Sequence, residues 1–363
     1  MKRLYCFLLL LIHSHFSNSQ EQAEFSMLDN KYQLNRETQL DNDYSAEINH
    51  FWESSAQIKT FSSQHGGTIN TLHIKTGQPN AIVISQGRNE SVLKYKELAF
   101  DLHKQGYDIF LIDHRGQGFS TRLGGDADRG HVEKFSHYVD DFHFFVESLQ
   151  LTKNYQSRFL LSHSMGGAIS ALYLQQQQHP FNKAAFFSPM FSVNLYQIPT
   201  FIVKIITYIS DKICHWFNRI PCYAPKSMRY TPIAFEDNQL TSSKKRYHSA
   251  FHTFEQVIET QLGGPTMHWL NESLYATEKL IKNANLINIP IIIIRSGADS
   301  IVTEKGQQAF YHQLSNRTKH ALIEIIDAKH ELLLEQDKYR IPALTAMLDF
   351  FKTNKYEGIK CTK

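Results

Sequence analysis

Short runs of apolar residues recur along most of the chain, and stretches with a helical spacing of apolar residues lie between several of them. The runs have the length of buried strands, and they occupy residues 56–61, 69–74, 81–84, 109–112, 159–161, 184–187, 291–294 and 322–326. Helical stretches include one from Val132 to Leu149 and one that begins at Met165. Strands that alternate with helices predict an α/β fold with a mostly parallel central sheet flanked by helices.

The first two runs show a different pattern. They are separated by Gln64-His65-Gly66-Gly67, and a pair of glycines between two apolar runs favours a tight turn. We therefore expect an antiparallel hairpin at the start of the fold.

The alternation stops between Ser188 and Asn288. This stretch lacks a convincing strand and is too long for an ordinary connection between two elements. We interpret residues 189–288 as an inserted, mainly helical cap, and residues 51–188 and 289–355 as the core domain that it interrupts.

Within the predicted cap, apolar residues recur at helical spacing. They are Ile198, Phe201, Ile202, Ile205, Ile206, Ile209, Ile213, Trp216 and Phe217. A stripe of this kind usually packs onto the body of its protein, so our first expectation is that it faces the core domain. The alternative is a lid or a membrane-contacting helix that admits a lipid.

The N-terminus differs from the rest of the chain. Lys2 and Arg3 precede a short apolar run, and small residues follow at Ser17-Asn18-Ser19. This layout is typical of a secretory signal peptide, which we expect at residues 1–19. The run is too short to span a bilayer as a helix, and the alternatives are an uncleaved N-terminal anchor or a short buried helix.

Two further segments complete the predicted organisation. Residues 20–50 are polar, and we expect a loose arm or a short helical lead-in. Residues 356–363 form the predicted C-terminal tail.

Composition and charge limit the function classes. The chain has 363 residues, of which 42% are hydrophobic, so it can form a large apolar core. The formal net charge of +3 offers no electrostatic attraction for nucleic acid. A basic membrane-facing patch, if present, must be local.

Cysteine usage leaves the compartment open. Cys6 lies in the predicted signal peptide, and Cys214, Cys222 and Cys361 follow. Cys214 and Cys222 are close enough to form a local disulfide in an exported protein, and could equally be free thiols. No group of cysteines and histidines has zinc-site spacing, and we expect neither a metal nor another cofactor.

The chemistry of the chain centres on Ser162-His163-Ser164-Met165-Gly166-Gly167, where a predicted buried strand meets a helix. A sharp strand-to-helix turn exposes a serine hydroxyl above the sheet edge, and residues two positions away must be small. Gly166 satisfies that demand, and Ser162 replaces the glycine that is usual on the other side. We predict that Ser164 is a nucleophile.

A serine hydroxyl needs a base, and the base needs a carboxylate that orients it. On this kind of fold the order along the chain is serine, acid, histidine, each after a later strand. Asp299 follows the run at 291–294, and His330 follows the run at 322–326. We predict that they complete a triad with Ser164. Asp327 is a weaker candidate for the acid because it lies close to the histidine and on the wrong strand.

Acyl transfer also requires an oxyanion hole. One donor should be the backbone N–H of Met165, the residue after the nucleophile. The second should come from the loop after the run at 81–84, where Gly87 allows close approach and the N–H of Arg88 is the best candidate. The Arg88 side chain could also meet a phosphate, although a surface arginine needs no such role, and we favour that simpler interpretation.

The residue type at position 164 excludes some chemistries. A dehalogenase or an epoxide hydrolase on this fold would carry a carboxylate there. Serine indicates esters, thioesters or amides as substrates.

The sequence resembles the lysophospholipase L2 branch of the monoacylglycerol-lipase-like hydrolases, in the serine aminopeptidase S33 superfamily of α/β-hydrolases. The resemblance covers residues 50–350. The segments that carry it are Gln86–Ser91, Tyr95–Ala99, Ile112–Gly118, Gly130–Val132, Tyr138–Asp141, His163–Ser170, Leu240–Ser243, Leu262–Thr266 and Ala328–Glu331. It implies the same triad, together with hydrolysis of one fatty-acyl ester of a lysophospholipid or a monoacylglycerol.

Alternatives to a lysophospholipase are a monoacylglycerol lipase, an S33-like serine aminopeptidase and a non-catalytic binding protein. An aminopeptidase would need carboxylates in its cap, where Glu236, Asp237, Glu255 and Glu259 occur. The resemblance implies peripheral contact with the inner membrane, whereas a cleaved signal peptide would place the protein in the periplasm or outside the cell.

Overall fold

The structure is a computed structural model that describes residues 30–40, 44–176, 178–196, 198–218 and 220–353. The predicted signal peptide and C-terminal tail lie outside the described residues. The strands are β1 (Ala56–Ser62), β2 (Thr68–Ile74), β3 (Asn80–Ser85), β4 (Tyr107–Asp113), β5 (Ser157–His163), β6 (Lys183–Phe187), β7 (Ile291–Ser296) and β8 (Ala321–Ile325). Every predicted strand is therefore present.

The described α-helices are α2 (Ala46–Ser55), α3 (Lys96–Lys104), α4 (Phe135–Ser148), α5 (Leu151–Asn154), α6 (Met165–Gln176), α7 (Thr200–Phe217), α8 (Lys244–Gln256), α9 (Met267–Lys282), α10 (Glu304–Gln313) and α11 (Asp337–Thr353). Short 3-10 helices are η1 (Glu37–Gln39), η2 (Val92–Tyr95), η3 (Phe235–Asp237), η4 (Ile258–Thr260), η5 (Ala284–Leu286), η6 (Arg317–Lys319) and η7 (Leu332–Leu334).

The eight strands form one sheet in the order β1-β2-β4-β3-β5-β6-β7-β8. β1 and β2 form the predicted antiparallel hairpin, and β2 is antiparallel to β4. All pairs from β4 to β8 are parallel. The strands that precede the predicted site residues are β3, β5, β7 and β8, so their carboxyl ends meet at one edge of the sheet.

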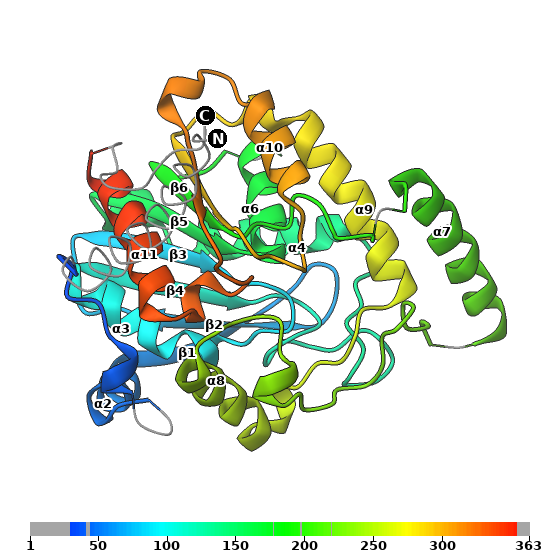
Figure 1. The fold of residues 1–363 in the computed structure, drawn as a ribbon, viewed down its shortest axis with the longest axis horizontal. Coiled ribbons are helices and arrows are strands. Elements are labelled where there is room, and N and C mark those ends of the chain that lie inside the picture. Colours follow the sequence, from blue (N-terminus) through cyan, green and yellow to red (C-terminus); the bar gives the residue numbers. More distant parts are fainter. Residues whose placement is uncertain (1–29, 41–43, 177, 197, 219, 354–363) are drawn as a thin grey trace, which may run out of the picture.

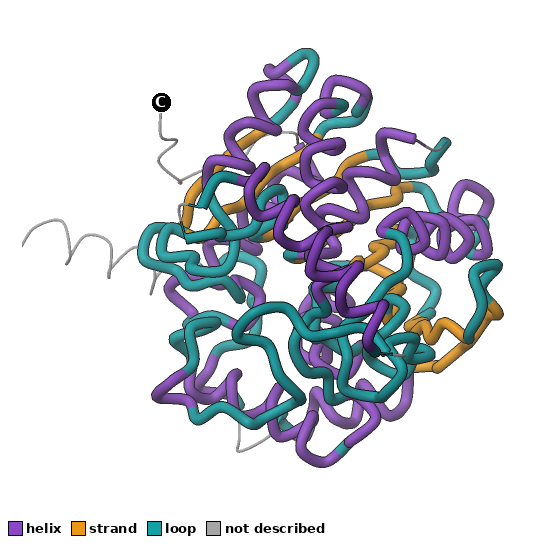
Figure 2. Tube along the Cα trace, turned by 90° about the vertical axis from the view of Figure 1, so that its right-hand side faces the viewer, coloured by secondary structure: helices purple, strands orange, loops and turns teal. Residues whose placement is uncertain are grey.

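Helices cover both faces of the sheet, as predicted, and an apolar cluster lies under each layer. One cluster joins the sheet to α2, α3 and α11, and the other joins it to α4, α6, α9 and α10. Figure 1 shows the two layers, and Figure 2 shows helices and loops in front of the strands from the side. The α/β fold inferred from alternating periodicity is confirmed.

Helix α4 begins at Phe135, three residues later than the apolar spacing from Val132 suggests. The preceding segment is extended because Gly130 forms a bridge with Pro265. The N–H of Phe135 then donates to the Glu272 carboxylate, 2.9 Å away, which caps the helix from another element.

The N-terminal segment is attached to the core where it is described. Leu34 and Leu40 are buried, and the N–H of Asn35 donates to the Asp101 carboxylate at 2.8 Å. Of the two forms expected for residues 20–50, the short helical lead-in fits these residues, and a loose arm does not.

The segment from 189 to 288 contains α7, α8 and α9 and, among its described residues, no strand of the sheet. Helix α9 packs on the core, with Trp269 and Leu280 buried beside α4 and α6. Helix α7 lies outside α9 at the margin of the molecule (Figure 1).

The expectation that the apolar stripe of α7 packs onto the core is wrong. Phe201, Ile205 and Ile209 are exposed, and so are Trp216 and Phe217. The polar side of the helix faces α9 instead, because α9 presents polar partners to it.

Candidate active site

Ser164 lies on the turn between β5 and α6. Its φ angle is 49°, in the left-handed region that non-glycine residues rarely adopt. The backbone holds this conformation through two bonds: the Ser164 N–H donates to the Phe187 carbonyl at 3.1 Å, and its carbonyl accepts from the Met190 N–H at 2.9 Å. The turn therefore has the strained geometry that exposes a nucleophile at a sheet edge.

The residues around Ser164 explain why the motif tolerates serine on one side but requires glycine on the other. A side chain at Gly166 would come within 2.0 Å of the Ser85 carbonyl oxygen. Ser162 is fully buried, and its hydroxyl donates to the Ser170 hydroxyl of α6 at 2.8 Å. Serine fits at position 162 because Ser170 supplies a partner for the buried hydroxyl.

The structure brings the three predicted triad residues into one chain of hydrogen bonds. His330 Nε2 is 2.9 Å from Ser164 Oγ, and His330 Nδ1 is 2.7 Å from Asp299 Oδ2. Ser164 is 8% exposed and His330 is 3% exposed, so bulk water has little access to the pair. This is the geometry required for proton transfer from a serine hydroxyl to an imidazole oriented by a carboxylate.

The loop after β7 holds Asp299 in its charged form. The other carboxylate oxygen, Oδ1, accepts from the N–H groups of Ile301 at 2.8 Å and Val302 at 3.0 Å. Burial by itself raises the pKa of Asp299, but the hydrogen bond and charge of His330 and the two amides outweigh burial and lower the pKa. Asp327, the weaker candidate for the acid, is not hydrogen-bonded to His330.

Both predicted oxyanion donors border the serine turn. Met165 is the first residue of α6, where the amides at a helix N-terminus lack intrahelical partners. Arg88 follows Gly87 at the carboxyl end of β3. Among the described residues, neither of these two N–H groups donates a backbone hydrogen bond. Both are therefore available to an incoming oxygen.

The Arg88 side chain is held by the protein. Its Nη2 donates to the Gly263 carbonyl at 2.6 Å, and its guanidinium lies over the Trp269 ring. Burial lowers the pKa of Arg88 to about 10, against the opposing effect of Tyr138 and Tyr223. The side chain connects the predicted oxyanion loop to the segment before α9, so it is not the surface arginine that was expected from sequence.

Glu90 is a site residue that sequence reasoning did not single out. Its Oε2 accepts from the Gly87 N–H at 2.8 Å, and its Oε1 lies 2.8 Å from His163 Nδ1. His163 Nε2 is 3.3 Å from the carbonyl oxygen of His330. Because both ring nitrogens of His163 face acceptors, the ring donates twice as an imidazolium. Glu90 thus connects the oxyanion loop, the nucleophile turn and the histidine loop.

Lys94 and Glu331 complete this buried network. Lys94 Nζ lies 2.7 Å from both Glu90 Oε1 and Glu331 Oε2. Burial lowers the pKa of His163, but the carboxylates of Glu331 and Glu90 outweigh burial and raise it. The pKa of Glu90 is lowered by Lys94 and His163 despite its burial. The positive charges of Lys94 and His163 balance the carboxylates of Glu90 and Glu331 next to the predicted triad.

Three residues of this network, Glu90, His163 and Glu331, form the one group in the described part of the chain whose ligand atoms could surround a metal ion. Lys94 already bridges the two carboxylates and supplies the compensating positive charge. The arrangement is therefore explained by an ion-pair network.

The chain is similar to a family of serine hydrolases and to lipid-ester hydrolases within it. The family described as serine aminopeptidase, S33, matches residues 77–337. Lysophospholipase L2 of Escherichia coli (strain K12) is 34% identical over 292 residues, which cover 78% of this chain and 83% of that protein. Monoglyceride lipase of Mus musculus is 23% identical over 262 residues, which cover 71% of this chain and 77% of that protein.

Solved structures share the fold. A soluble variant of monoglyceride lipase from Saccharomyces cerevisiae, in complex with a substrate analog, aligns with a TM-score of 0.61 at 20% identity. The alignment covers 83% of this chain and 96% of that chain. At this level of identity the similarity shows the α/β-hydrolase fold.

Proposed function

Because the chain belongs to the serine aminopeptidase S33 family of α/β-hydrolases, we propose that it is a serine esterase that releases a fatty acid from a lysophospholipid. The observation that carries the proposal is the hydrogen-bonded series of Ser164, His330 and Asp299. The lysophospholipid is supported by the name of the relative from E. coli. Monoacylglycerol is the second candidate substrate, supported by the name of the mouse relative.

The proposed mechanism assigns one step to each group. His330 removes the proton of Ser164 as the serine oxygen attacks the acyl carbonyl. The amides of Met165 and Arg88 stabilise the oxyanion, and Asp299 orients His330 and stabilises its charged form. The bond between the acyl carbon and the glycerol oxygen then breaks, and that oxygen takes the proton from His330 as the glycerophospho-alcohol leaves. Water activated by His330 then hydrolyses the acyl-enzyme and releases the fatty acid.

Aminopeptidase activity is disfavoured by the predicted cap. An aminopeptidase must bind a free amine with carboxylates that face its pocket. Glu236, Asp237, Glu255 and Glu259 are all exposed to solvent. Glu236 pairs with Lys244, and Glu255 borders a hollow of about 820 Å³ beside α8 whose lining includes none of the triad residues.

The proposed location is the periplasm or the exterior of the cell, with peripheral contact to a membrane. The Cys214–Cys222 disulfide supports an oxidising compartment. No helix in the described residues has the length and apolar character needed to cross a bilayer. Sequencing the N-terminus of the mature protein would test cleavage near residue 19.

The decisive experiment is a substrate panel on purified protein, with Ser164→Ala as the paired variant. We expect fatty-acid release from a lysophospholipid to exceed release from a monoacylglycerol, with no cleavage of a prolyl amide. Ser164→Ala should lower kcat by several orders of magnitude while the fold remains intact. It should also abolish labelling by a fluorophosphonate. Near-normal esterase activity in the variant would refute the nucleophile, and absence of labelling in the wild type would favour a binding protein.

A further inference from the structure

Helix α7 presents a polar face to the protein. The inward positions are Lys204, Thr207, Asp211 and Cys214, which follow one another at intervals of three and four residues. Each has a partner. Lys204 pairs with Glu278, Thr207 Oγ1 donates to Asn271 Oδ1 at 3.0 Å, and Asp211 Oδ2 lies 2.8 Å from His268 Nδ1.

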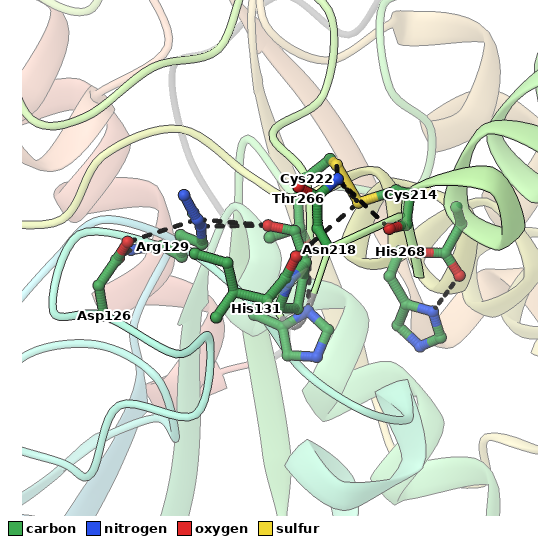
Figure 3. Close-up of a disulfide and its surroundings, with 11 residues drawn as sticks. Asp126, Arg129, His131, Cys214, Asn218, Cys222, Thr266 and His268 are labelled. Carbon is green, nitrogen blue, oxygen red and sulfur yellow. Dashed lines mark hydrogen bonds and ion pairs between the residues drawn. A yellow bond between two sulfur atoms is a disulfide. The ribbon is translucent and has the colours of Figure 1, made fainter. Parts of the chain in front are cut away.

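The C-terminal end of α7 has a covalent attachment as well. Cys214 is joined to Cys222 by a disulfide, and Asn218 Nδ2 approaches the Cys222 sulfur at 3.5 Å (Figure 3). The next residue, Tyr223, bridges to Thr266 at the start of α9. These contacts fix which side of α7 faces the protein.

The opposite side of α7 is apolar and exposed. The outer residues range from 37% exposed for Ile202 to 84% exposed for Trp216, and they are Phe201, Ile202, Ile205, Ile206, Tyr208, Ile209, Ile213, Trp216 and Phe217. We call this set the outer face of α7. Single exposed apolar residues are ordinary, but a continuous group of this kind marks an interaction surface.

We propose that the outer face of α7 docks on an anionic lipid surface, with the helix lying in the plane of the interface. The composition fits that occupant, because the middle of the face consists of isoleucines and Tyr208, and aromatic side chains occupy its ends at Phe201, Trp216 and Phe217. The helix lies on the membrane rather than through it, since α7 does not meet the requirements of a spanning helix.

The charges of α7 complement an anionic surface. Lys212 is exposed and its Nζ lies over the Tyr208 ring, so its ammonium group lies at the outer face of α7. The one acidic residue of α7, Asp211, is turned inward to His268. A lipid phosphate would therefore meet the Lys212 ammonium group at the outer face of α7.

The position of α7 relates docking to the site. Its partner α9 carries Trp269, which lies under the Arg88 guanidinium of the predicted oxyanion loop. Helix α9 therefore contacts both α7 and the Arg88 side chain of the predicted oxyanion loop. This inference rests on the proposed function only in that a lipid-ester hydrolase must meet its substrate at a membrane.

Vesicle flotation of the full chain tests the proposal. The probe is a vesicle of phosphatidylethanolamine and phosphatidylglycerol in a ratio of about three to one, with pure phosphatidylcholine as the uncharged comparison. The double variant Ile205→Ser/Ile209→Ser changes the outer face. Its matched control is Ile58→Ser/Leu286→Ser, because all four residues are about half exposed, the control residues lie outside the outer face, and none of the four belongs to the proposed active site.

Tryptophan fluorescence gives a second readout on the same samples. Trp216 is the exposed tryptophan, whereas Trp52 and Trp269 are buried. Docking should move the emission of the wild type to shorter wavelength on addition of anionic vesicles. Trp216→Phe should bind as the wild type does and lose most of this shift.

We expect anionic vesicles to bind the wild type and the control equally, and Ile205→Ser/Ile209→Ser to bind at least tenfold more weakly. Hydrolysis of a soluble short-chain ester should be equal in all three, so a failure of the proposed esterase is distinguished from a failure of docking. Equal flotation of the outer-face variant, or absence of flotation in the wild type, overturns the proposal. A dimer in sedimentation equilibrium that the outer-face variant dissociates, without vesicle binding, assigns the face to a second copy.

Discussion

Helices α4 and α7 are both amphipathic, but they turn opposite sides to the protein. Helix α4 buries Tyr138, Phe142 and Phe145 between the sheet and its neighbours. Helix α7 exposes its apolar side and attaches through hydrogen bonds, ion pairs and a disulfide. The difference lies in what each helix meets, because α4 rests on an apolar sheet face whereas α7 rests on polar residues of α9. Amphipathic spacing therefore specifies a stripe but not its partner.

The same contrast applies to the charged groups of the two regions. Behind the triad, the network of Glu90, Lys94, His163 and Glu331 is almost fully buried. The pair between Asp211 and His268 on α7 is partly exposed to solvent. Removal of one partner from a buried network leaves an uncompensated charge, whereas water can replace a partner at the surface.

The largest expected difference comes from truncating one aromatic side chain in each helix. Phe142→Ala should destabilise the fold by about 3–5 kcal/mol because it opens a cavity in the core. Phe201→Ala should change the free energy of unfolding by less than about 0.5 kcal/mol, since the ring is exposed. Denaturant titration of both variants measures this. A cost at Phe201 similar to that at Phe142 would mean that α7 buries its apolar side in solution.

A second pair of variants compares the charged groups. Glu90→Gln should cost about 3 kcal/mol of stability and lower kcat about tenfold or more, because the Gly87 and His163 contacts that position the site are weakened. Asp211→Asn should cost less than about 1 kcal/mol and leave kcat unchanged.

Thermal unfolding and short-chain ester kinetics check this pair, and a pH–rate profile separates positioning from simple loss of fold. A folded Glu90→Gln protein with wild-type kcat and pH profile would show that the buried network is only structural.

Removal of the disulfide should have a smaller and local effect. Replacing both Cys214 and Cys222 by serine should lower the stability of the α7 attachment by about 2–3 kcal/mol, the chain-entropy estimate for a loop of this length. The effect should be confined to α7 because α4, α6 and α9 hold the core without it. Hydrogen exchange would show faster exchange in α7 and unchanged protection in α4. Equal loss of protection in both helices would contradict the local attachment.

The smallest expected effect is a pH dependence of the α7 attachment. Burial lowers the pKa of His268, but the hydrogen bonds to Asp211 and the Glu133 carbonyl and the nearby carboxylates outweigh burial and raise it. The pair between Asp211 and protonated His268 therefore stabilises the attachment of α7 fully below about pH 6.5, the ordinary pKa of histidine. This stabilisation is lost as the pH rises through the raised pKa of His268. Burial lowers the pKa of the adjacent His131 to about 4, so His131 stays neutral in this range.

Hydrogen exchange in α7, corrected for intrinsic rates, should show weaker protection at pH 8.5 than at pH 5.5. Asp211→Asn should remove most of that difference in protection, which corresponds to less than about 1 kcal/mol. Protection that increases with pH in the wild type would contradict the sign of the linkage.

Much of the fold and the spatial proximity of the three proposed triad residues could be predicted from sequence, because both depend on local order along the chain. Apolar runs of strand length alternate with helical spacing, and this periodicity reflects burial directly. Ser164, Asp299 and His330 each follow a strand, and parallel strands end at the same edge of the sheet. Their spatial proximity was therefore implied by topology.

The partners of buried polar groups could not be predicted in the same way. Glu90 is one glutamate in a loop until tertiary contacts place Gly87, His163 and Lys94 around it. From sequence, Ser162 is only a departure from the usual motif. The structure explains it, because the Ser170 hydroxyl accepts a hydrogen bond from the Ser162 hydroxyl. The Cys214–Cys222 pairing was open from spacing alone, since free thiols fit the same sequence.

The sequence by itself determined the α/β fold, the order of the proposed catalytic residues and the existence of an apolar stripe on α7. The tertiary structure decided which way that stripe faces. Periodicity records that one side of a helix is apolar, but orientation depends on the surface of a neighbour that is distant in sequence. Here Glu278, Asn271 and His268 of α9 bind the polar side of α7, and the apolar side is left facing outward.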